Sequence, residues 1–252
     1  VLQQTLENGK LDKHDFLLFM GTSMASPHVA AGAAMVISQG VTHPDKVEQI
    51  LKATADSSLK ERFDDEQEFR ERYGAGLMQV DKAVTKANTT QGGLRLTLGL
   101  LFALLAAGAA RRKDTLGLGV EHKTLLFSSA GVVASGLFVL PLIFGDATWV
   151  QYFSRPLAEM DILLFGLESH QNPLMASALI PLAAYGLLGH RNKLGVVACG
   201  IALGMAAFGF SEVLYLTSDV RLIPGMDLLD RAWLGANALV SFSIGYFGLR
   251  RA

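Results

Sequence analysis

A serine that could act as a nucleophile stands at position 23, directly after a continuous apolar stretch at residues 16–20. The stretch predicts a buried strand, and Gly21 predicts a tight turn. The small apolar residues that follow predict a helix that begins at or near Ser23 and is buried on nearly every face. A serine in the first turn of a helix lies at the positive end of its dipole, where its backbone N–H could donate to an oxyanion. The same pattern also fits a simple helix cap at Thr22 or Ser23.

Residues 21–32, GTSMASPHVAAG, are similar to the active-site serine motif of the subtilase (S8, subtilisin-like) family of serine proteases. Ala31 departs from the usual pattern, which has glycine at that position. The resemblance implies that Ser23 is the nucleophile and that its N–H is one oxyanion donor. It also implies a structural role for His28, and it gives the same framework role to Gly21, Thr22, Met24, Ala25 and Pro27.

Two later segments extend the resemblance over about residues 16–85. Residues 44–55 have helical apolar spacing and resemble the helix that follows the nucleophile helix in subtilases, with Thr42 as an expected cap. Residues 73–84, YGAGLMQVDKAV, resemble the segment that closes the catalytic domain. The implied fold of residues 1–88 is α/β, the C-terminal and mostly helical portion of a subtilisin-like three-layer domain.

A subtilase mechanism also needs an aspartate, a histidine and an oxyanion-hole asparagine, which in the family precede the serine. Asp12, His14 and Asp15 precede Ser23 but lack the family's motif contexts. We therefore expect this chain to be the C-terminal part of a longer serine endopeptidase that cleaves polypeptides, with an N-terminal segment supplying those groups. The alternative is a non-catalytic membrane protein that keeps a subtilase remnant as a folding or interaction module.

The charge pattern and the cysteine content limit the kinds of partner, cross-link and cofactor that we expect. No basic patch interleaved with aromatics is present, so we expect no nucleic-acid partner. The single Cys199 excludes an intrachain disulfide. Subtilases often bind calcium, and residues 56–72 are rich in carboxylates, but their spacing fits no defined calcium loop and favours a solvated loop or short exposed helix. We expect no cofactor.

The second part of the chain has a different composition. Residues 1–92 carry 23 of the 45 Lys, Arg, Asp and Glu residues, and the change falls near a small polar linker at residues 89–93. Residues 94–252 then contain apolar stretches near the length that crosses a bilayer. The sequence predicts an all-α membrane bundle of about five helices, with the lipid bilayer as partner and spans at 94–110, 124–145, 173–189, 194–216 and 232–249.

The loops between these stretches predict an orientation. Lys and Arg residues follow the first, third and fifth stretches, as at Arg112 and Arg191, whereas the other loops are richer in acids. The positive-inside rule then places the C-terminus in the cytoplasm and residues 1–92 outside, in what we expect to be a bacterial cell membrane. Trp149, Tyr152 and Trp233 fall where interfacial aromatic residues are expected.

Two features inside the predicted bundle have alternative interpretations. Gly200 and Gly204 form a small-xxx-small pair, for which helix packing is favoured over oligomerisation. Glu212 is an acid inside a predicted span, which makes it a functional candidate by default. Because it lies about one turn from the outer end, a solvated interfacial acid is the favoured interpretation.

Overall fold

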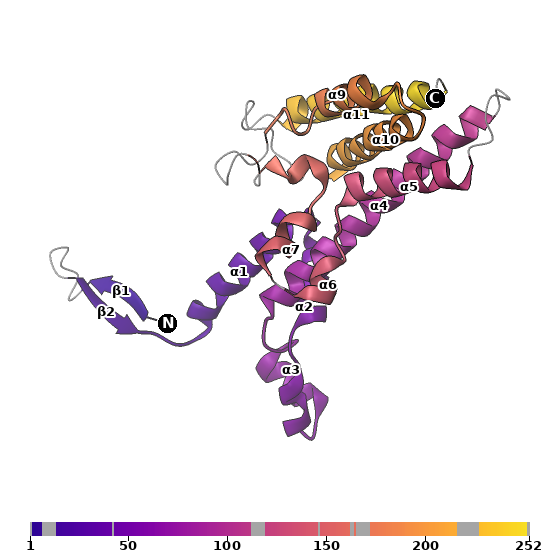
Figure 1. Cartoon of the computed structure of the whole chain (residues 1–252). Coiled ribbons are helices and arrows are strands. Elements are labelled where there is room, and N and C mark those ends of the chain that lie inside the picture. Colours follow the sequence, from indigo (N-terminus) through magenta and orange to yellow (C-terminus); the bar gives the residue numbers. More distant parts are fainter. Residues whose placement is uncertain are drawn as a thin grey trace. The chain divides into compact units, whose positions relative to one another are not determined.

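The computed structural model describes residues 2–6, 14–41, 43–111, 119–145, 147–161, 164, 172–215 and 227–250. These residues are mostly helical, and they divide into two compact units (Figure 1). Unit 1 holds residues 1–38 and 43–84, and unit 2 holds residues 39–42 and 85–252.

Unit 1 begins with an antiparallel hairpin of β1 (Leu2–Leu6) and β2 (His14–Leu18), paired in the register Leu2 to Leu18. Helix α1 (Thr22–Ser38) follows Gly21, so the predicted order of strand, turn and helix is confirmed. The expected burial of the strand is wrong, since Phe16 and Leu18 are 62% and 79% exposed. The described strands form a sheet of these two strands alone, so the α/β three-layer portion expected for residues 1–88 is not confirmed. Two paired strands give too little sheet for helices to cover as layers.

Helix α2 (Pro44–Thr54) confirms the helix predicted at residues 44–55. Its apolar stripe buries Val47 and Ile50, and Pro44 occupies the start of the helix, where a missing N–H costs nothing. The N-cap residue is His43, whose side chain makes no capping hydrogen bond. The expected cap, Thr42, was placed one residue too early and lies outside the described residues.

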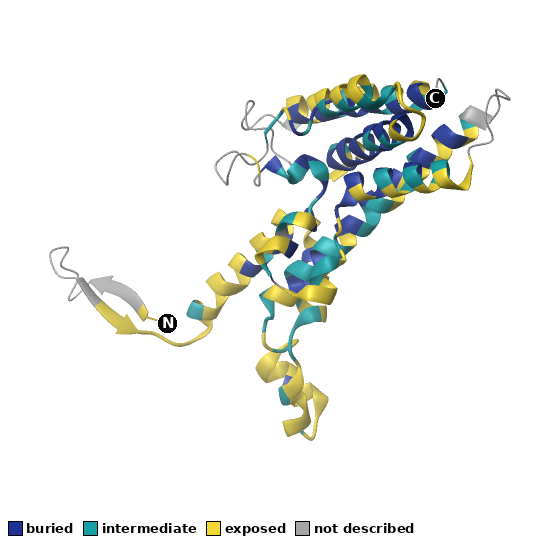
Figure 2. Ribbon diagram, in the orientation of Figure 1, coloured by how far each residue is buried: buried dark blue, intermediate teal, exposed yellow. Residues whose placement is uncertain are grey.

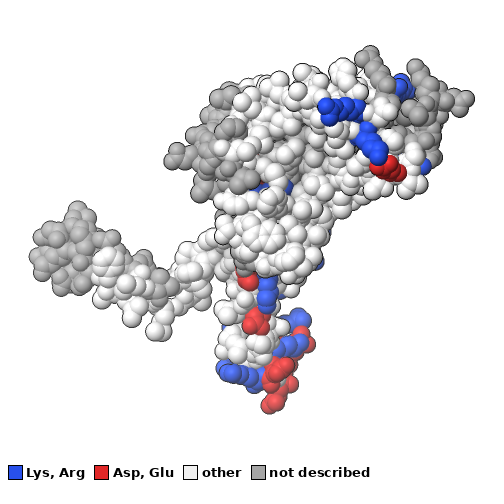
Figure 3. Space-filling view, viewed as in Figure 1, with Lys and Arg blue, Asp and Glu red and all other residues white. Residues whose placement is uncertain are grey.

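The charged region after α2 forms the turn helix η2 (Ser58–Arg62) and helix α3 (Glu66–Tyr73). The Asp65 carboxylate caps α3 by accepting a hydrogen bond from the Gln67 backbone N–H at 2.9 Å. Phe63, Phe69 and Tyr73 pack their rings together, and most other side chains of α3 are exposed. Lys, Arg, Asp and Glu gather here on the visible surface (Figure 3). A short exposed helix was one of the two structures favoured for this region.

Helix α4 (Val80–Arg111) is continuous across the segment predicted as a linker. Residues 89–93 therefore lie inside a helix, although they include two adjacent glycines. The Thr89 and Thr90 hydroxyls both donate to the Lys86 carbonyl, so these polar side chains are satisfied without interrupting the helix. The boundary between the two units falls within α4, at residues 84 and 85.

Unit 2 is a bundle that contains most of α4 together with α5 (Val120–Ser135), α9 (Leu179–Leu188), α10 (Asn192–Tyr215) and α11 (Asp227–Leu249). Helix α10 packs against α5, α9 and α11, and most of its residues are buried (Figure 2). Close contacts show that α5 runs parallel to α10, since Lys193 pairs with Glu121 and Gly204 lies against Ala130. Helix α11 runs antiparallel to α10, with Gly209 against Ala238 and Gly245 against Leu203.

Among the described residues, three helical segments are long and apolar enough to cross a membrane: Val80–Ala109, Asn192–Tyr215 and Leu228–Leu249. They cover nearly all of the first and fourth predicted spans, at 94–110 and 194–216, and the whole of the fifth, at 232–249. The predicted spans at 124–145 and 173–189 are not single long helices. Helix α5 has 16 residues and α9 has 10, which correspond to only about 24 and 15 Å.

The second predicted span is interrupted at Gly136. This residue has φ +64° and caps α5, and the chain then forms two short helices, α6 (Leu140–Phe144) and α7 (Thr148–Phe153). Pro141 lies in the first turn of α6, where proline is tolerated but cannot continue a preceding helix. In the third predicted span, residues 173–178 are turns before α9.

Candidate functional site

Ser23 lies in the first turn of α1 and is exposed. Gly21 directly precedes the helix with φ +132°, a conformation that L-residues with a side chain rarely adopt. This glycine redirects the chain from the hairpin into α1. The sequence therefore places the serine hydroxyl on the accessible end of a helix.

The first backbone N–H groups of α1 that reach an acceptor are those of Met24 and Ala25, which both donate to the Gly21 carbonyl. The N–H groups of Thr22 and Ser23 precede them, at the end of the helix where donors have no intrahelical acceptor. Such a terminus has a partial positive charge and suits a developing oxyanion. Pro27 follows four residues after Ser23 inside the helix, and it has no N–H to donate to the Ser23 carbonyl.

The other motif residues fall around this turn. Thr22 is the first helical residue, Met24 is half-buried, and Ala25 and Pro27 are exposed. His28 is also exposed, and its Nδ1 donates a hydrogen bond to the Met24 carbonyl at 2.6 Å. That nitrogen is therefore engaged within the helix.

The groups that would activate Ser23 are not assembled here. Within the described residues, no hydrogen bond joins the Ser23 hydroxyl to a histidine or carboxylate. His14 and Asp15 lie on β2, and Asp12 lies outside the described residues. A serine without a general base is a weak nucleophile, so among the described residues the segment offers only an exposed hydroxyl and a helix N-terminus.

Helix α1 is buried on one side of its second half only, which corrects the expectation of burial on nearly every face. Gly32 and Val36 are its buried residues. A Cβ on Gly32 would lie 2.8 Å from the Met78 Sδ atom, so a side chain there would displace the flexible end of Met78. Three larger apolar side chains of α1, those of Val29, Met35 and Ile37, are exposed.

Residues 73–84, which resemble the end of a subtilase domain, are held to the chain after α2 by a backbone bridge. Asp56 and Leu77 exchange two N–H to carbonyl hydrogen bonds of 2.8 and 2.9 Å. Gly76 has φ +122°, and a Cβ there would overlap the Asp56 carbonyl. The Asp56 carboxylate accepts a hydrogen bond from the Ser58 backbone N–H, and this bond lowers the pKa of Asp56. Over the described ranges, no group of three or more His, Cys, Asp or Glu residues is arranged to hold a metal ion.

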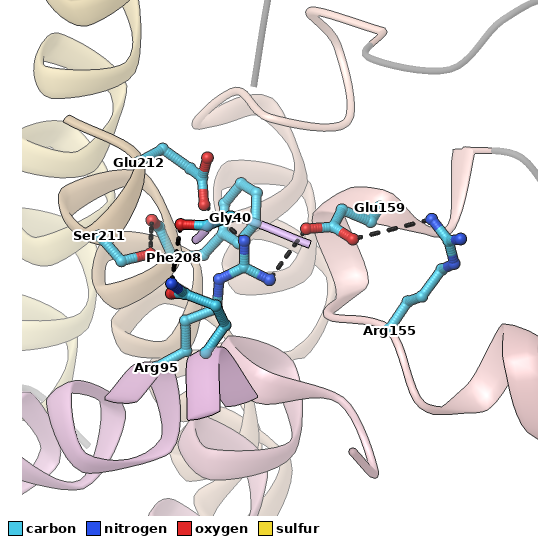
Figure 4. A network of polar contacts seen from close by, with 8 residues as sticks. Gly40, Arg95, Arg155, Glu159, Phe208, Ser211 and Glu212 are labelled. Atoms are coloured by element: carbon cyan, nitrogen blue, oxygen red, sulfur yellow. Dashed lines mark hydrogen bonds and ion pairs between the residues drawn. The ribbon is translucent and has the colours of Figure 1, made fainter. Parts of the chain in front are cut away.

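A second polar site lies inside the bundle and joins three elements (Figure 4). Arg95 of α4 pairs with Glu212 of α10 at 2.6 Å and with Glu159 of η3 (Leu157–Glu159) at 2.9 Å. The side chains of Arg95 and Glu212 are only 8% and 1% exposed. The guanidinium also lies 5.0 Å from the centre of the Phe208 ring. We call Arg95, Glu159 and Glu212 the Arg95 network.

The surroundings of the Arg95 network contribute further polar contacts. Arg155 reaches Glu159 at 3.9 Å from the more exposed side. One turn before Arg95 on the same helix face, the Gln91 amide donates to the Gly40 carbonyl at 2.8 Å. The Arg95 Nε atom is buried and makes no hydrogen bond among the described residues. The network therefore satisfies two of the three nitrogens of a buried guanidinium.

The Arg95 network corrects the interpretation of Glu212 as a solvated acid. Glu212 is buried and paired, because Arg95 reaches it from a helix 117 residues earlier in the chain. Sequence analysis missed Arg95, although an arginine just inside an apolar stretch was a usable signal. By contrast, the packing role favoured for Gly200 and Gly204 is confirmed, since a Cβ on either residue would overlap atoms of α5.

The structure has two parts: a segment with an exposed serine in the first turn of a helix, and a helical bundle with helices of membrane-crossing length. The model of the subtilase family matches residues 3–76, which include Ser23. The model described as a domain of unknown function (DUF5942) matches residues 118–252, so the chain belongs to the DUF5942 family. No curated protein and no solved structure matches the chain. All of α4, including Arg95, lies between the two matched regions.

Proposed function

We propose that this chain carries the nucleophile and the membrane anchor of a subtilisin-like serine endopeptidase. One observation carries the proposal: Ser23 is exposed in the first turn of a helix that follows a positive-φ glycine, within the region similar to subtilases. The helices of membrane-crossing length support anchoring in a bilayer.

In the proposed reaction, the Ser23 hydroxyl attacks the carbonyl carbon of a peptide bond. A histidine outside this chain takes the hydroxyl proton and then gives it to the leaving amine, and an aspartate orients that histidine. The Ser23 N–H and an asparagine side chain, also from outside this chain, donate to the oxyanion. Water then hydrolyses the acyl-enzyme on Ser23. No cofactor takes part in these steps.

We propose that Ser23 acts on the non-cytoplasmic side of a bacterial cell membrane, with the C-terminus in the cytoplasm. The directions of the helices support a chain that crosses the bilayer in alternating directions, because α5 and α10 run one way while α11 runs the other. Lys123, Arg191 and Lys193 lie at the starts of α5 and α10. The positive-inside rule makes that end cytoplasmic. Arg112, Lys113 and Arg251, which also entered the prediction, lie outside the described residues.

A non-catalytic role is the second candidate. The observation that favours it is the lack of a hydrogen-bonded histidine or carboxylate at Ser23 among the described residues. Under this alternative, the Ser23 segment would be a folding or interaction module beside the membrane.

A membrane-impermeant fluorophosphonate probe, used on intact cells that express the full-length protein, tests both the chemistry and the side. We expect Ser23→Ala to abolish labelling, and Ser26→Ala, a matched change one turn further along α1, to preserve it. Labelling only after cell lysis would contradict the proposed side. Labelling that persists in Ser23→Ala would contradict the proposed nucleophile, and no labelling of the wild type by any route would favour the non-catalytic role.

A further inference from the structure

The segment between α5 and η3 leaves the bundle and returns to it at the same place. The Leu137 N–H donates to the Phe153 carbonyl at 2.9 Å, which joins the two ends of the segment. Gly136 lies directly beside the backbone of Ser154 and Arg155, where a Cβ would overlap it. Between these points are only the short helices α6 and α7, which contact each other. We call these two helices with residues 137–139 the α6–α7 hairpin.

The α6–α7 hairpin exposes large apolar side chains. Leu142 and Ile143 are 63% and 68% exposed, and Phe144, Trp149 and Phe153 are each about half exposed. Phe144 and Trp149 pack their rings together at 5.3 Å. Residues 124–154 contain one charged residue, Asp146, which lies outside the described residues. A surface of this kind is costly in water and matches the boundary between headgroups and acyl chains.

The base of the hairpin lies at one end of the bundle. Phe138 contacts α4 at Gly92, one turn before Arg95. Directly after the hairpin, Ala158 of η3 packs with Val133, Met205 and Phe208, and Glu159 pairs with Arg95. Arg95 lies at the start of the apolar run of α4 at residues 94–110, and Glu212 lies in the last turn of α10. The hairpin therefore starts where the bundle passes from apolar to polar surroundings.

We propose that the α6–α7 hairpin is an interfacial membrane anchor that inserts Leu142, Ile143, Phe144 and Trp149 among lipids at the Arg95 end of the bundle. Its helices have five and six residues, so they lie within the interface and do not cross the bilayer. Tryptophan is favoured at this depth because it has an apolar body and a polar N–H. This inference rests on the membrane anchoring proposed above.

The chain has two tryptophans, which allow a direct test. The Trp233→Phe variant keeps Trp149 in the hairpin, and Trp149→Phe keeps Trp233 in α11. Each purified variant would be reconstituted into vesicles of phosphatidylcholine with brominated acyl chains. We expect bromines near the headgroup to quench Trp149 more strongly than bromines near the chain ends. Replacing both Leu142 and Ile143 with serine should weaken that quenching, whereas Val120→Ser, a change at a more exposed apolar residue at the start of α5, should not.

Trp233 separates the two ways in which the test could fail. If Trp233 is quenched by brominated lipid but Trp149 is quenched only by aqueous iodide, the hairpin faces water and the inference is wrong while anchoring stands. Protection of Trp149 from both quenchers would mean that protein covers it, which also overturns the inference. If brominated lipid quenches neither tryptophan, the anchoring itself is contradicted.

Discussion

Helices α1 and α10 are both built from small and apolar residues with few polar side chains, yet their burial differs. In α10, fifteen of the 24 residues are buried, because α5, α9 and α11 surround it. In α1, Gly32 and Val36 are the buried residues. Such a composition indicates that a helix requires a cover, but it does not say whether the same chain provides it. Under the proposed function, the rest of a subtilisin-like domain covers α1.

Glycine has different roles in the two helices. Gly21 provides a backbone angle before α1, and a Cβ added there would meet no atom within 4 Å. Gly204 has helical geometry, and its value is the missing side chain, because a Cβ would lie 2.7 Å from the Ala130 carbonyl oxygen. The Ser23 segment thus depends on local conformation, whereas the bundle depends on contacts between helices distant in sequence.

The largest expected effect comes from Arg95→Leu. This change leaves Glu159 and Glu212 without their common partner inside the bundle. Removing one partner of a buried ion pair costs about 3–5 kcal/mol, and we expect the free energy of unfolding to fall by that amount. Unfolding of the purified chain by SDS titration in mixed micelles would measure it.

Arg155→Leu is the matched control for this prediction. Arg155 is 36% exposed and lies 3.9 Å from Glu159, so its loss should cost less than about 1 kcal/mol. Adding Glu212→Leu to Arg95→Leu should restore part of the stability, since a buried carboxylate that has lost its arginine is then removed. If Arg95→Leu and Arg155→Leu lowered the free energy of unfolding equally, burial of the Arg95–Glu212 pair would not determine its contribution to stability.

The parts of the fold that depend on neighbours in sequence could be predicted. The strand, the turn at Gly21, the start of α1 near Ser23 and the helix α2 follow from spacing and backbone preferences within a few residues. The Arg95 network could not be derived in this way, because its partners are 117 residues apart and the pairing depends on which helix faces meet. The break at Gly136 was missed because the apolar run continues past it, although glycine and Pro141 were a signal.

A comparison of two helical glycines would sharpen the contrast in packing. Gly204→Val places a branched side chain against Ala130 and Val133, and overpacking of this kind costs about 1–3 kcal/mol. Gly108→Ala in α4 meets no atom within 4 Å, and we expect it to be neutral or to stabilise by about 0.5–1 kcal/mol through helix propensity. The same SDS titration would measure both variants. A Gly204→Val variant as stable as the wild type would mean that α5 and α10 do not pack as closely as described.

The smallest effect concerns Asp56, beside the Asp56–Leu77 bridge of unit 1. The backbone N–H of Ser58 stabilises the ionised carboxylate, so the pKa of Asp56 is lower in the folded state than in the unfolded chain. A depressed pKa contributes stability above the unfolded value, and this contribution is lost as pH falls through the folded value. Asp56→Asn should therefore be less stable than the wild type at neutral pH, and the difference should shrink on acidification below the usual aspartate range.

Salt provides the control for this prediction. Because the hydrogen bond is short and local, the stability difference between Asp56→Asn and the wild type should persist at high salt, where screening weakens interactions between distant charges. A difference that vanishes with salt at neutral pH would instead assign the effect to Lys82, whose charge also lowers this pKa.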